Sequence, residues 1–287
     1  MTKPHVIAVA GPTASGKTAL AIQIAKEHNG EIISADSRLV YKGFDIASAK
    51  PTMEEREGIP HHLIDIVEPE VDYSVGDFYR DAKPVIADII ERGKTPIVAG
   101  GTGLYFRILL EDFNLPKMEP NLELRAELEA TPSEVLYEEI RLKDPVAAEK
   151  VHINNKIRLV RILEVMRTFN KPFSQVAGKK DCEYDVRWLT PKIGSREELY
   201  DRINKRVDMM IEQGLIEETK FLLNKHGRIK NFVKTIGYAE ILEYLDGNCS
   251  LAESVENIKQ NTRRYAKRQL TWFRRNPELT DLLPRMK

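Results

Sequence analysis

Short apolar runs and amphipathic segments alternate through the first hundred residues. Residues 6–10, 31–35 and 95–99 are short runs rich in apolar and β-branched side chains, which predicts buried parallel strands. Residues 19–28 and 81–91 carry the spacing of helices. This alternation predicts an α/β fold, a parallel sheet flanked by helices, whose ligands bind at the carboxyl ends of the strands.

The pattern changes at about residue 114, where prolines become frequent and amphipathic segments replace the strand-like runs. We predict helices at residues 122–130, 133–142 and 157–167. A strand-like run returns at residue 187 and more helices follow. The chain is therefore expected to consist of a catalytic core, residues 1–114 and 187–287, and a helical insertion domain, residues 115–186.

The first predicted strand leads directly into the pattern G-x-x-x-x-G-K-[ST] of a P-loop, and a predicted helix follows. The pattern consists of Gly11, Pro12, Thr13, Ala14, Ser15, Gly16, Lys17 and Thr18. Its backbone N–H groups are expected to bind phosphate, Lys17 to neutralise phosphate oxygens, and the Thr18 hydroxyl to hold Mg²⁺. The core is therefore predicted to be P-loop NTPase-like.

The P-loop leaves open which bond breaks. A kinase would pass the terminal phosphoryl group to an acceptor, whereas another enzyme would hold diphosphate as a leaving group and transfer its organic part.

Polar residues follow the second and third predicted strands. Asp36 comes directly after the second strand, and its carboxylate is a candidate general base, a metal ligand or a cap of the local turn. Gly100-Gly-Thr102-Gly-Leu-Tyr105 follows the third strand and resembles a second turn facing phosphate, although its glycines also suit a tight turn of the chain. Both segments are expected at the same edge of the sheet as the P-loop.

His61 and His62 precede another strand-like run, residues 63–66. Adjacent side chains diverge on an extended segment, and no further ligands lie at a suitable spacing, so a metal site is not expected there. Cys182 and Cys249 are far apart and match no disulfide framework or zinc motif, which favours a reducing, cytoplasmic location. No signal peptide or membrane helix is predicted.

The 287 residues carry 44 basic and 44 acidic side chains, so no overall field attracts a polyanion. Positive charge is nevertheless concentrated in two segments. Residues 257–275 contain seven Lys and Arg and no acidic residue, and residues 156–171 contain a second cluster. Each segment is a candidate surface for nucleic acid or simply a solvated helix face. Trp272 and Phe273 could stack on a base, but their spacing favours a place in the core.

Several motifs, in order along nearly the whole chain, resemble those of the tRNA dimethylallyltransferases, also called tRNA isopentenyltransferases. They are the P-loop, Ser34-Ala-Asp-Ser37, Ala49-Lys50-Pro51, His61-His62-Leu-Ile-Asp-Ile66, Gly100-Gly-Thr-Gly-Leu-Tyr105, Arg158-Leu-Val-Arg161, Ile236-Gly-Tyr238 and Tyr265-Ala-Lys-Arg-Gln-Leu-Thr-Trp-Phe-Arg274.

The resemblance implies transfer of a dimethylallyl group from dimethylallyl diphosphate to N6 of adenine 37 in the tRNA anticodon stem-loop. It implies that Asp36 is the base, that Thr102 lies near the reacting groups, and that Arg202 joins the P-loop and Mg²⁺ around the diphosphate. The tRNA contacts it implies are Asp36, Ser37, Arg38, Leu39, Thr102, Arg125, Ile157, Arg158, Leu159, Val160 and Arg161.

The expected chemistry suits these residues, because a base near N6 and a stabilised leaving group are what an aromatic amine needs in order to attack an allylic carbon. We expect a monomer. The alternatives are a small-molecule kinase, a prenyltransferase acting on free adenylate, and an RNA-binding protein without turnover.

Overall fold

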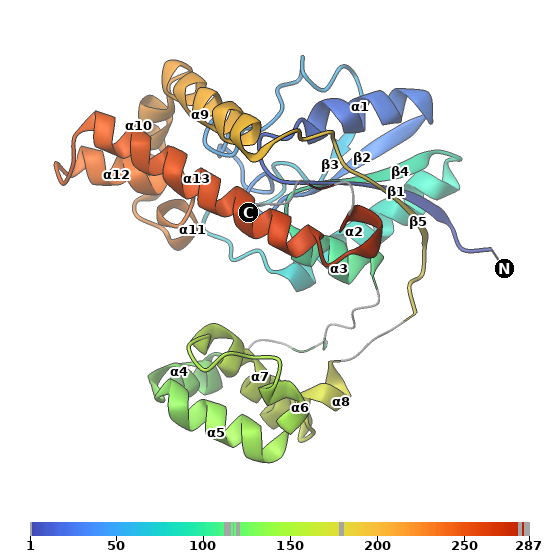
Figure 1. Ribbon diagram of the computed structural model, residues 1–287, viewed down its shortest axis with the longest axis vertical. Helices are drawn as coiled ribbons and strands as arrows, with labels where there is room; N and C mark the ends of the chain where they lie inside the picture. The colour runs from blue at the N-terminus through green and yellow to red at the C-terminus, as the bar shows by residue number, and fades with distance from the viewer. Residues whose placement is uncertain are drawn as a thin grey trace. The chain divides into compact units, whose positions relative to one another are not determined.

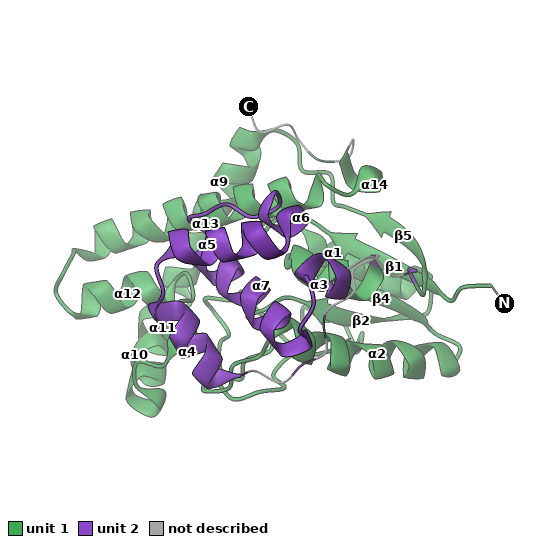
Figure 2. Cartoon of the chain, turned by 90° about the horizontal axis from the view of Figure 1, so that it is seen from below, with its two compact units in different colours: residues 1–110, 183–287 green, residues 111–182 purple. Residues whose placement is uncertain are grey.

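The computed structural model describes residues 2–111, 116, 118, 121–177, 181–280 and 283. The chain forms two compact units, residues 1–110 with 183–287, called unit 1, and residues 111–182, called unit 2 (Figure 2). Unit 2 begins and ends four residues earlier than the expected insertion, 115–186. Unit 2 ends early because the next strand of unit 1 begins at Asp185, before the expected boundary at residue 187.

Unit 1 is built on a five-stranded sheet in the order β3-β2-β4-β1-β5, and every pairing in it is parallel. The strands are β1 (His5–Ala10), β2 (Gly30–Ala35), β3 (His61–His62), β4 (Thr95–Gly100) and β5 (Asp185–Leu189). The central strands are almost entirely buried, which explains their continuous apolar sequences. The predicted α/β fold with a parallel sheet is confirmed.

Helices cover both faces of this sheet (Figure 1). On one face, α1 (Lys17–Glu27) packs its buried residues against Ile7, Ile32 and Ile97. On the other face lie α2 (Val75–Glu91) and α3 (Gly103–Leu110). The helix expected at 81–91 thus begins six residues earlier, because Ser74 and Asp77 form a capping box at its start.

The strand expected at residues 63–66 is absent from the described structure. Leu63 and Asp65 have φ angles of 63° and 56°, in the left-handed region that no strand adopts. The strand lies instead at His61–His62, which pair with Ile32 and Ile33. The Asp65 side chain binds the ammonium group of Lys50, and this buried lysine holds the turn in its conformation.

The C-terminal part of unit 1 is helical and has its own hydrophobic core. Its helices are α9 (Arg196–Glu212), α10 (Leu215–His226), α11 (Lys230–Val233), α12 (Tyr238–Leu245), α13 (Leu251–Phe273) and α14 (Pro277–Thr280). Phe44, Phe232 and Tyr238 form the aromatic centre of this core. The far end of α13 contacts α3 through Phe273 and Phe106, whose ring centroids are 5.7 Å apart. Phe273 is buried, as predicted.

Unit 2 consists of short helices around a small apolar core. They are α4 (Leu122–Ala130), α5 (Ser133–Lys143), α6 (Pro145–Ala148), α7 (Lys156–Phe169) and α8 (Phe173–Val176). The Glu164 side chain is fully buried on α7 and accepts hydrogen bonds from Arg125 and Arg161. Within the described ranges of both units, no helix combines the length and the apolar character needed to cross a bilayer.

A buried ionic cluster lies at the amino end of the sheet. The Glu31 carboxylate, 3% exposed, accepts hydrogen bonds from Arg92 at 2.5 and 2.8 Å, from Lys94 at 2.7 Å and from His62 at 2.8 Å. The hydrogen bonds from Arg92, followed by those from Lys94 and His62, hold the pKa of Glu31 well below its usual range, despite burial. This carboxylate therefore stabilises the fold when it is ionised, and the contribution is lost as the pH falls below its ordinary pKa of 4.5.

We predict that Glu31→Gln lowers the free energy of unfolding at pH 7 by about 2 kcal/mol, since it removes charged hydrogen bonds in a buried position. Urea unfolding followed by circular dichroism measures the change. Glu27→Gln, an exposed position on α1, is the control and should have little effect. Equal stability of the two variants at pH 7 would contradict the prediction, as would a difference that does not become smaller as the pH falls from 5 to 2.

Candidate active site

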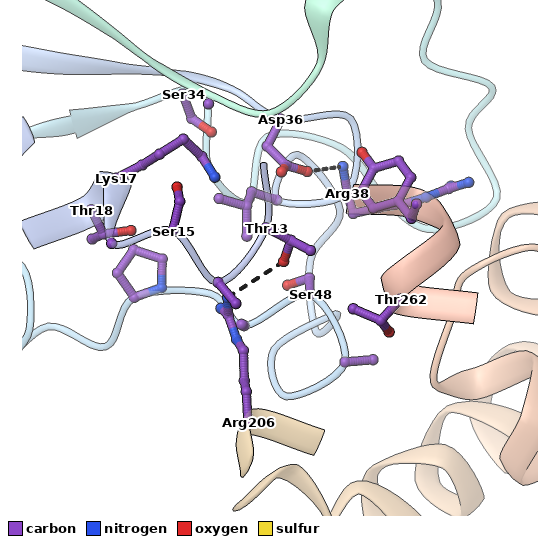
Figure 3. A pocket seen from close by; sticks show the side chains of 18 of the residues that line it. Thr13, Ser15, Lys17, Thr18, Ser34, Asp36, Arg38, Ser48, Arg206 and Thr262 are labelled. Atoms are coloured by element: carbon purple, nitrogen blue, oxygen red, sulfur yellow. Dashed lines mark hydrogen bonds between the residues drawn. The ribbon is translucent and has the colours of Figure 1, made fainter. Parts of the chain in front are cut away.

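A cavity of about 970 Å³ lies in unit 1 where the central strands end (Figure 3). The P-loop, the segment after β2 and residues of α9 and α13 line it. Residues 47–49 and 234–237 also line it, as do residues between 51 and 64 and the end of β4. Segments that are more than two hundred residues apart in the chain thus share one pocket, at the edge of the sheet where ligands were expected.

The P-loop has a compact form maintained by its own residues and by α13. Ala14 and Gly16 adopt φ angles of 58° and 91°, and α1 begins directly after Gly16. The Lys17 ammonium donates to the Pro12 carbonyl at 2.5 Å. The Thr13 N–H donates to the side-chain oxygen of Gln269 at 2.8 Å, so this N–H already has an acceptor within the protein. The N–H groups of residues 14–18 are the ones that remain in position to bind an anion.

Two cations face the loop and lie near a carboxylate. Burial lowers the pKa of Lys17 from 10.5 to about 8, the Asp36 carboxylate opposes this shift, and the Arg206 guanidinium adds to it. Burial also lowers the pKa of Arg206, again opposed by Asp36. Both shifts mean that the positive charges lack full compensation within the protein, which is the electrostatic condition for binding an anion.

Arg206 was not identified from the sequence, and the structure favours it over Arg202. The Arg206 guanidinium approaches the Thr13 hydroxyl at 3.5 Å and is half-buried (Figure 3). Arg202 also lines the cavity, but it is exposed and donates to the Ile193 carbonyl. The two arginines are four residues apart and share one side of α9, so the helical spacing could have indicated the second from the first.

Asp36 and Thr102 are brought together, as the sequence predicted for two strand ends at one edge. The Asp36 carboxylate accepts from the Arg38 N–H at 2.8 Å, which fixes its orientation (Figure 3). The Thr102 hydroxyl accepts from the Ser37 N–H at 3.1 Å, and the Thr102 N–H donates to the Ala35 carbonyl at 3.1 Å. The Thr102 hydroxyl proton is consequently directed to a different acceptor.

The turn that carries Thr102 depends on glycine at its first position. A Cβ atom on Gly100 would lie 2.1 Å from the Ala35 carbonyl oxygen, much closer than any real contact. Only glycine allows the backbone of this turn to approach the end of β2 so closely. The close approach is what places Thr102 beside Ser37.

The candidate RNA-contacting residues fall into two groups. Ser37, Arg38 and Leu39 line the cavity of unit 1 together with Asp36. Thr102, also in unit 1, is not among the lining residues but lies beside Ser37. The other candidates, Arg125 and residues 157–161, belong to unit 2.

Within unit 2 the expectation needs a correction. Leu159 and Val160 are 0% and 5% exposed and pack in the core, so their side chains are not at the surface. Ile157 and Arg158 precede them on α7 and are exposed. The helix alternates between buried and exposed positions, and a contiguous motif cannot lie entirely on one face.

The basic segment of residues 257–275 is partly neutralised by neighbouring groups. Lys259 pairs with Asp208 at 2.6 Å, and Arg263 binds Glu256 and Asn204. Arg264, Lys267 and Arg268 are exposed on α13. Trp272, expected in the core, is half-buried and packs against Gly103.

Together these features define a P-loop α/β protein whose anion-binding loop faces a carboxylate across one cavity. The family model described as IPP transferase matches residues 39–276, and a second model, described as isopentenyl transferase, matches residues 4–68. The chain belongs to the IPP transferase family.

Similar proteins cover almost the full length of the chain. It is 49% identical over 281 residues to the tRNA dimethylallyltransferase of Alkaliphilus oremlandii, covering 95% of this chain and 89% of that protein. The corresponding protein of Anoxybacillus flavithermus is 46% identical over 271 residues, with 94% and 87% of the two chains covered.

Two solved structures resemble the fold. The tRNA isopentenylpyrophosphate transferase from Bacillus halodurans has a TM-score of 0.70 at 43% identity, covering 96% of this chain and 88% of that chain. A eukaryotic dimethylallyltransferase acting on tRNA has a TM-score of 0.80 at 32% identity, covering 98% and 73%.

We predict that diphosphate binding takes up a proton above pH 8. A phosphate oxygen beside Lys17 favours its ammonium form, so the bound state raises a pKa that is about 8 in the free protein. Affinity for inorganic diphosphate should therefore weaken as the pH rises past this value. Titration calorimetry at pH 9 in two buffers with different ionisation enthalpies measures the uptake, which should approach about one proton per site.

Lys17→Arg is the matched control, because arginine keeps its charge at this pH. The difference between the two proteins isolates Lys17 from the ionisation of diphosphate itself. Identical proton uptake in both would show that Lys17 does not titrate on binding.

Proposed function

We propose that this protein transfers the dimethylallyl group of dimethylallyl diphosphate to N6 of adenine 37 in the tRNA anticodon loop, which gives N6-isopentenyladenosine and diphosphate. The observation that carries the proposal is the single cavity in which the P-loop cations and the Asp36 carboxylate meet. Full-length similarity to tRNA dimethylallyltransferases supports it.

The diphosphate binds along the part of the P-loop that keeps its N–H groups available, residues 14–18. Lys17 and Arg206 neutralise the charge that develops on the leaving oxygen as the carbon–oxygen bond breaks. Arg202 lines the same cavity and provides a further positive charge near its mouth. Charge stabilisation by groups already in position lowers the barrier without any rearrangement during the reaction.

The site also suits Mg²⁺. The Thr18 hydroxyl lines the cavity, and the hydroxyls of Ser15 and Ser34 are buried there without a hydrogen-bond partner among the described residues. Buried hydroxyls without partners in the protein are costly, so a polar ligand at this position would stabilise them. Thr18 would hold the ion, and Ser15 and Ser34 would bind its water molecules or the phosphate oxygens. When bound, Mg²⁺ neutralises diphosphate oxygens and makes the group a better leaving group.

Asp36 acts as the base for the adenine amine. Its carboxylate accepts a hydrogen bond from the N6 amino group and takes the proton as N6 bonds to the allylic carbon. The diphosphate leaves with the electron pair of the broken carbon–oxygen bond. The Thr102 hydroxyl accepts a hydrogen bond from the Ser37 N–H, and we assign it a contact with the adenine or the reacting groups.

The tRNA substrate requires a base that has left the stack of the anticodon loop, which single-stranded loops permit. Ser37, Arg38 and Leu39 contact the nucleotide at the cavity, and Ile157, Arg158, Arg125 and Arg161 of unit 2 contribute the other RNA contacts. We propose that the protein acts as a monomer. We place the reaction in the cytoplasm, where its tRNA substrate is found.

The deciding experiment incubates the purified protein with Mg²⁺, radiolabelled dimethylallyl diphosphate and unmodified tRNA carrying A36-A37-A38, with free AMP in a parallel reaction. Label that maps to adenine 37 supports the proposal. Label only in AMP assigns the protein to prenyl transfer on a free nucleotide, and label in neither overturns prenyl transfer. ATP turnover with phosphoryl transfer to an acceptor would indicate a kinase.

We predict that Asp36→Asn lowers the rate of transfer by about 10²- to 10⁴-fold, because the amide keeps the shape of the side chain but cannot accept the proton. Single-turnover kinetics measures the rate, and filter binding measures tRNA affinity, which should change little. Asp72→Asn, an exposed position, is the control. Parallel loss of transfer and tRNA binding would remove Asp36 from the base role.

We also predict that Arg264→Gln combined with Lys267→Gln weakens tRNA binding and reduces its dependence on salt. Each lost phosphate contact lowers the slope of log K against log salt by about 1. Lys3→Gln with Lys26→Gln is the control, because both lysines are exposed and neither lines the cavity. An unchanged slope in the first pair would exclude this side of α13 from the RNA interface.

A further inference from the structure

Gln269 connects the two loops that the proposed reaction requires. It lies on α13 and is 5% exposed. Its side-chain oxygen accepts from the Thr13 N–H at 2.8 Å, and its side-chain nitrogen donates to the Gly101 carbonyl at 2.9 Å. Thr13 belongs to the P-loop after β1, and Gly101 belongs to the turn after β4, the strand paired with β1.

The orientation of this amide follows from its partners. A backbone N–H only donates and a backbone carbonyl only accepts, so rotating the amide by 180° would break both hydrogen bonds. A buried amide without partners is costly, by about 1–3 kcal/mol for each unsatisfied group. Gln269 is thus held in one arrangement, and it fixes the separation of the two loops it joins.

The turn is shaped to receive α13. A Cβ atom on Gly101 would lie 2.2 Å from the Gln269 side-chain nitrogen, and one on Gly103 would lie 2.0 Å from the Trp272 ring. Glycine at both positions lets the helix approach the backbone of the turn directly. Phe273 extends the contact through its ring packing on Phe106. The two glycines that flank Thr102 therefore admit the helix that carries Gln269.

Each end of the connection lies next to a group of the proposed mechanism. The Thr13 hydroxyl is approached by Arg206 at 3.5 Å, and the Thr102 N–H and hydroxyl bond to residues 35 and 37, next to Asp36. Moving one loop by about 1 Å relative to the other would misplace the leaving group relative to the attacking amine, and such errors cost about 100-fold in rate.

From this geometry we propose that Gln269 is a positioning residue. It fixes the distance between the diphosphate site and the Thr102 turn and does not contact the reacting atoms. The inference rests on the proposed function, since it assigns the leaving group to one loop and the adenine acceptor to the other. It also explains why a residue near the end of the chain contributes to a site built from its first hundred residues.

The first test uses Gln269→Met, which keeps the length of the side chain and loses both hydrogen bonds, with the exposed Gln260→Met on the same helix as control. We expect kcat to fall about 100-fold, while KM for dimethylallyl diphosphate and Kd for tRNA change less than about threefold. The loss should be much smaller in a Thr102→Ala background, because the Thr102 side chain that Gln269 positions is already absent there. Unchanged kcat, full additivity, or equal losses in affinity, melting temperature and kcat would overturn the inference.

The second test is independent of prenyl transfer. In a Trp188→Phe protein, Trp272 is the single remaining tryptophan, and it packs on the Thr102 turn through Gly103. Inorganic diphosphate with Mg²⁺ should change its fluorescence, and Gln269→Met should abolish this change while calorimetry still detects binding. The same fluorescence change in both proteins would overturn the connection. If the Trp188→Phe protein shows the change but wild-type protein transfers no prenyl group, the proposed function alone would be overturned.

Discussion

The site depends on three parallel strands that end at the same level of the sheet. Gly100 at the end of β4 is in register with Ala10 at the end of β1 and with Ala35 at the end of β2. Gly11 of the P-loop and Asp36 come one residue beyond these positions, and Thr102 comes two residues beyond. Parallel pairing therefore brings together three loops that are far apart in the sequence. Gly100 packs directly on Ala35, which brings the Thr102 turn close to the segment that carries Asp36.

The electrostatics of the cavity follow from this convergence. Burial disfavours the charges of Lys17 and Arg206, and one carboxylate, Asp36, offsets them only in part. A phosphate group would compensate both cations, and in doing so it would leave Asp36 available to a second substrate.

Unit 2 has a different construction, because its helices are short and its core is small. Arg125 and Arg161 both bind the buried carboxylate of Glu164, so removal of either affects the stability of α7 as well as any contact with RNA. Exposed Ile157 and Arg158 have no such structural role in the described contacts. They separate an RNA contact from a stability effect more cleanly than the paired arginines do.

The sequence by itself determined the three central strands of the sheet, the P-loop and the placement of Asp36 and Thr102, because these depend on local hydrophobic patterns and on the rule that parallel strands share a carboxyl edge. It also identified the segments that resemble the family. It did not determine the direction of individual side chains. The left-handed turn at Leu63 and Asp65, the burial of Leu159 and Val160, and the position of Arg206 all depend on packing. Gln269 is the clearest case, since its partners are 256 and 168 residues away in the chain. Only the tertiary structure decides such contacts. The direction of a side chain is selected by the free energy of its contacts, and many of these contacts are with residues far away in the sequence.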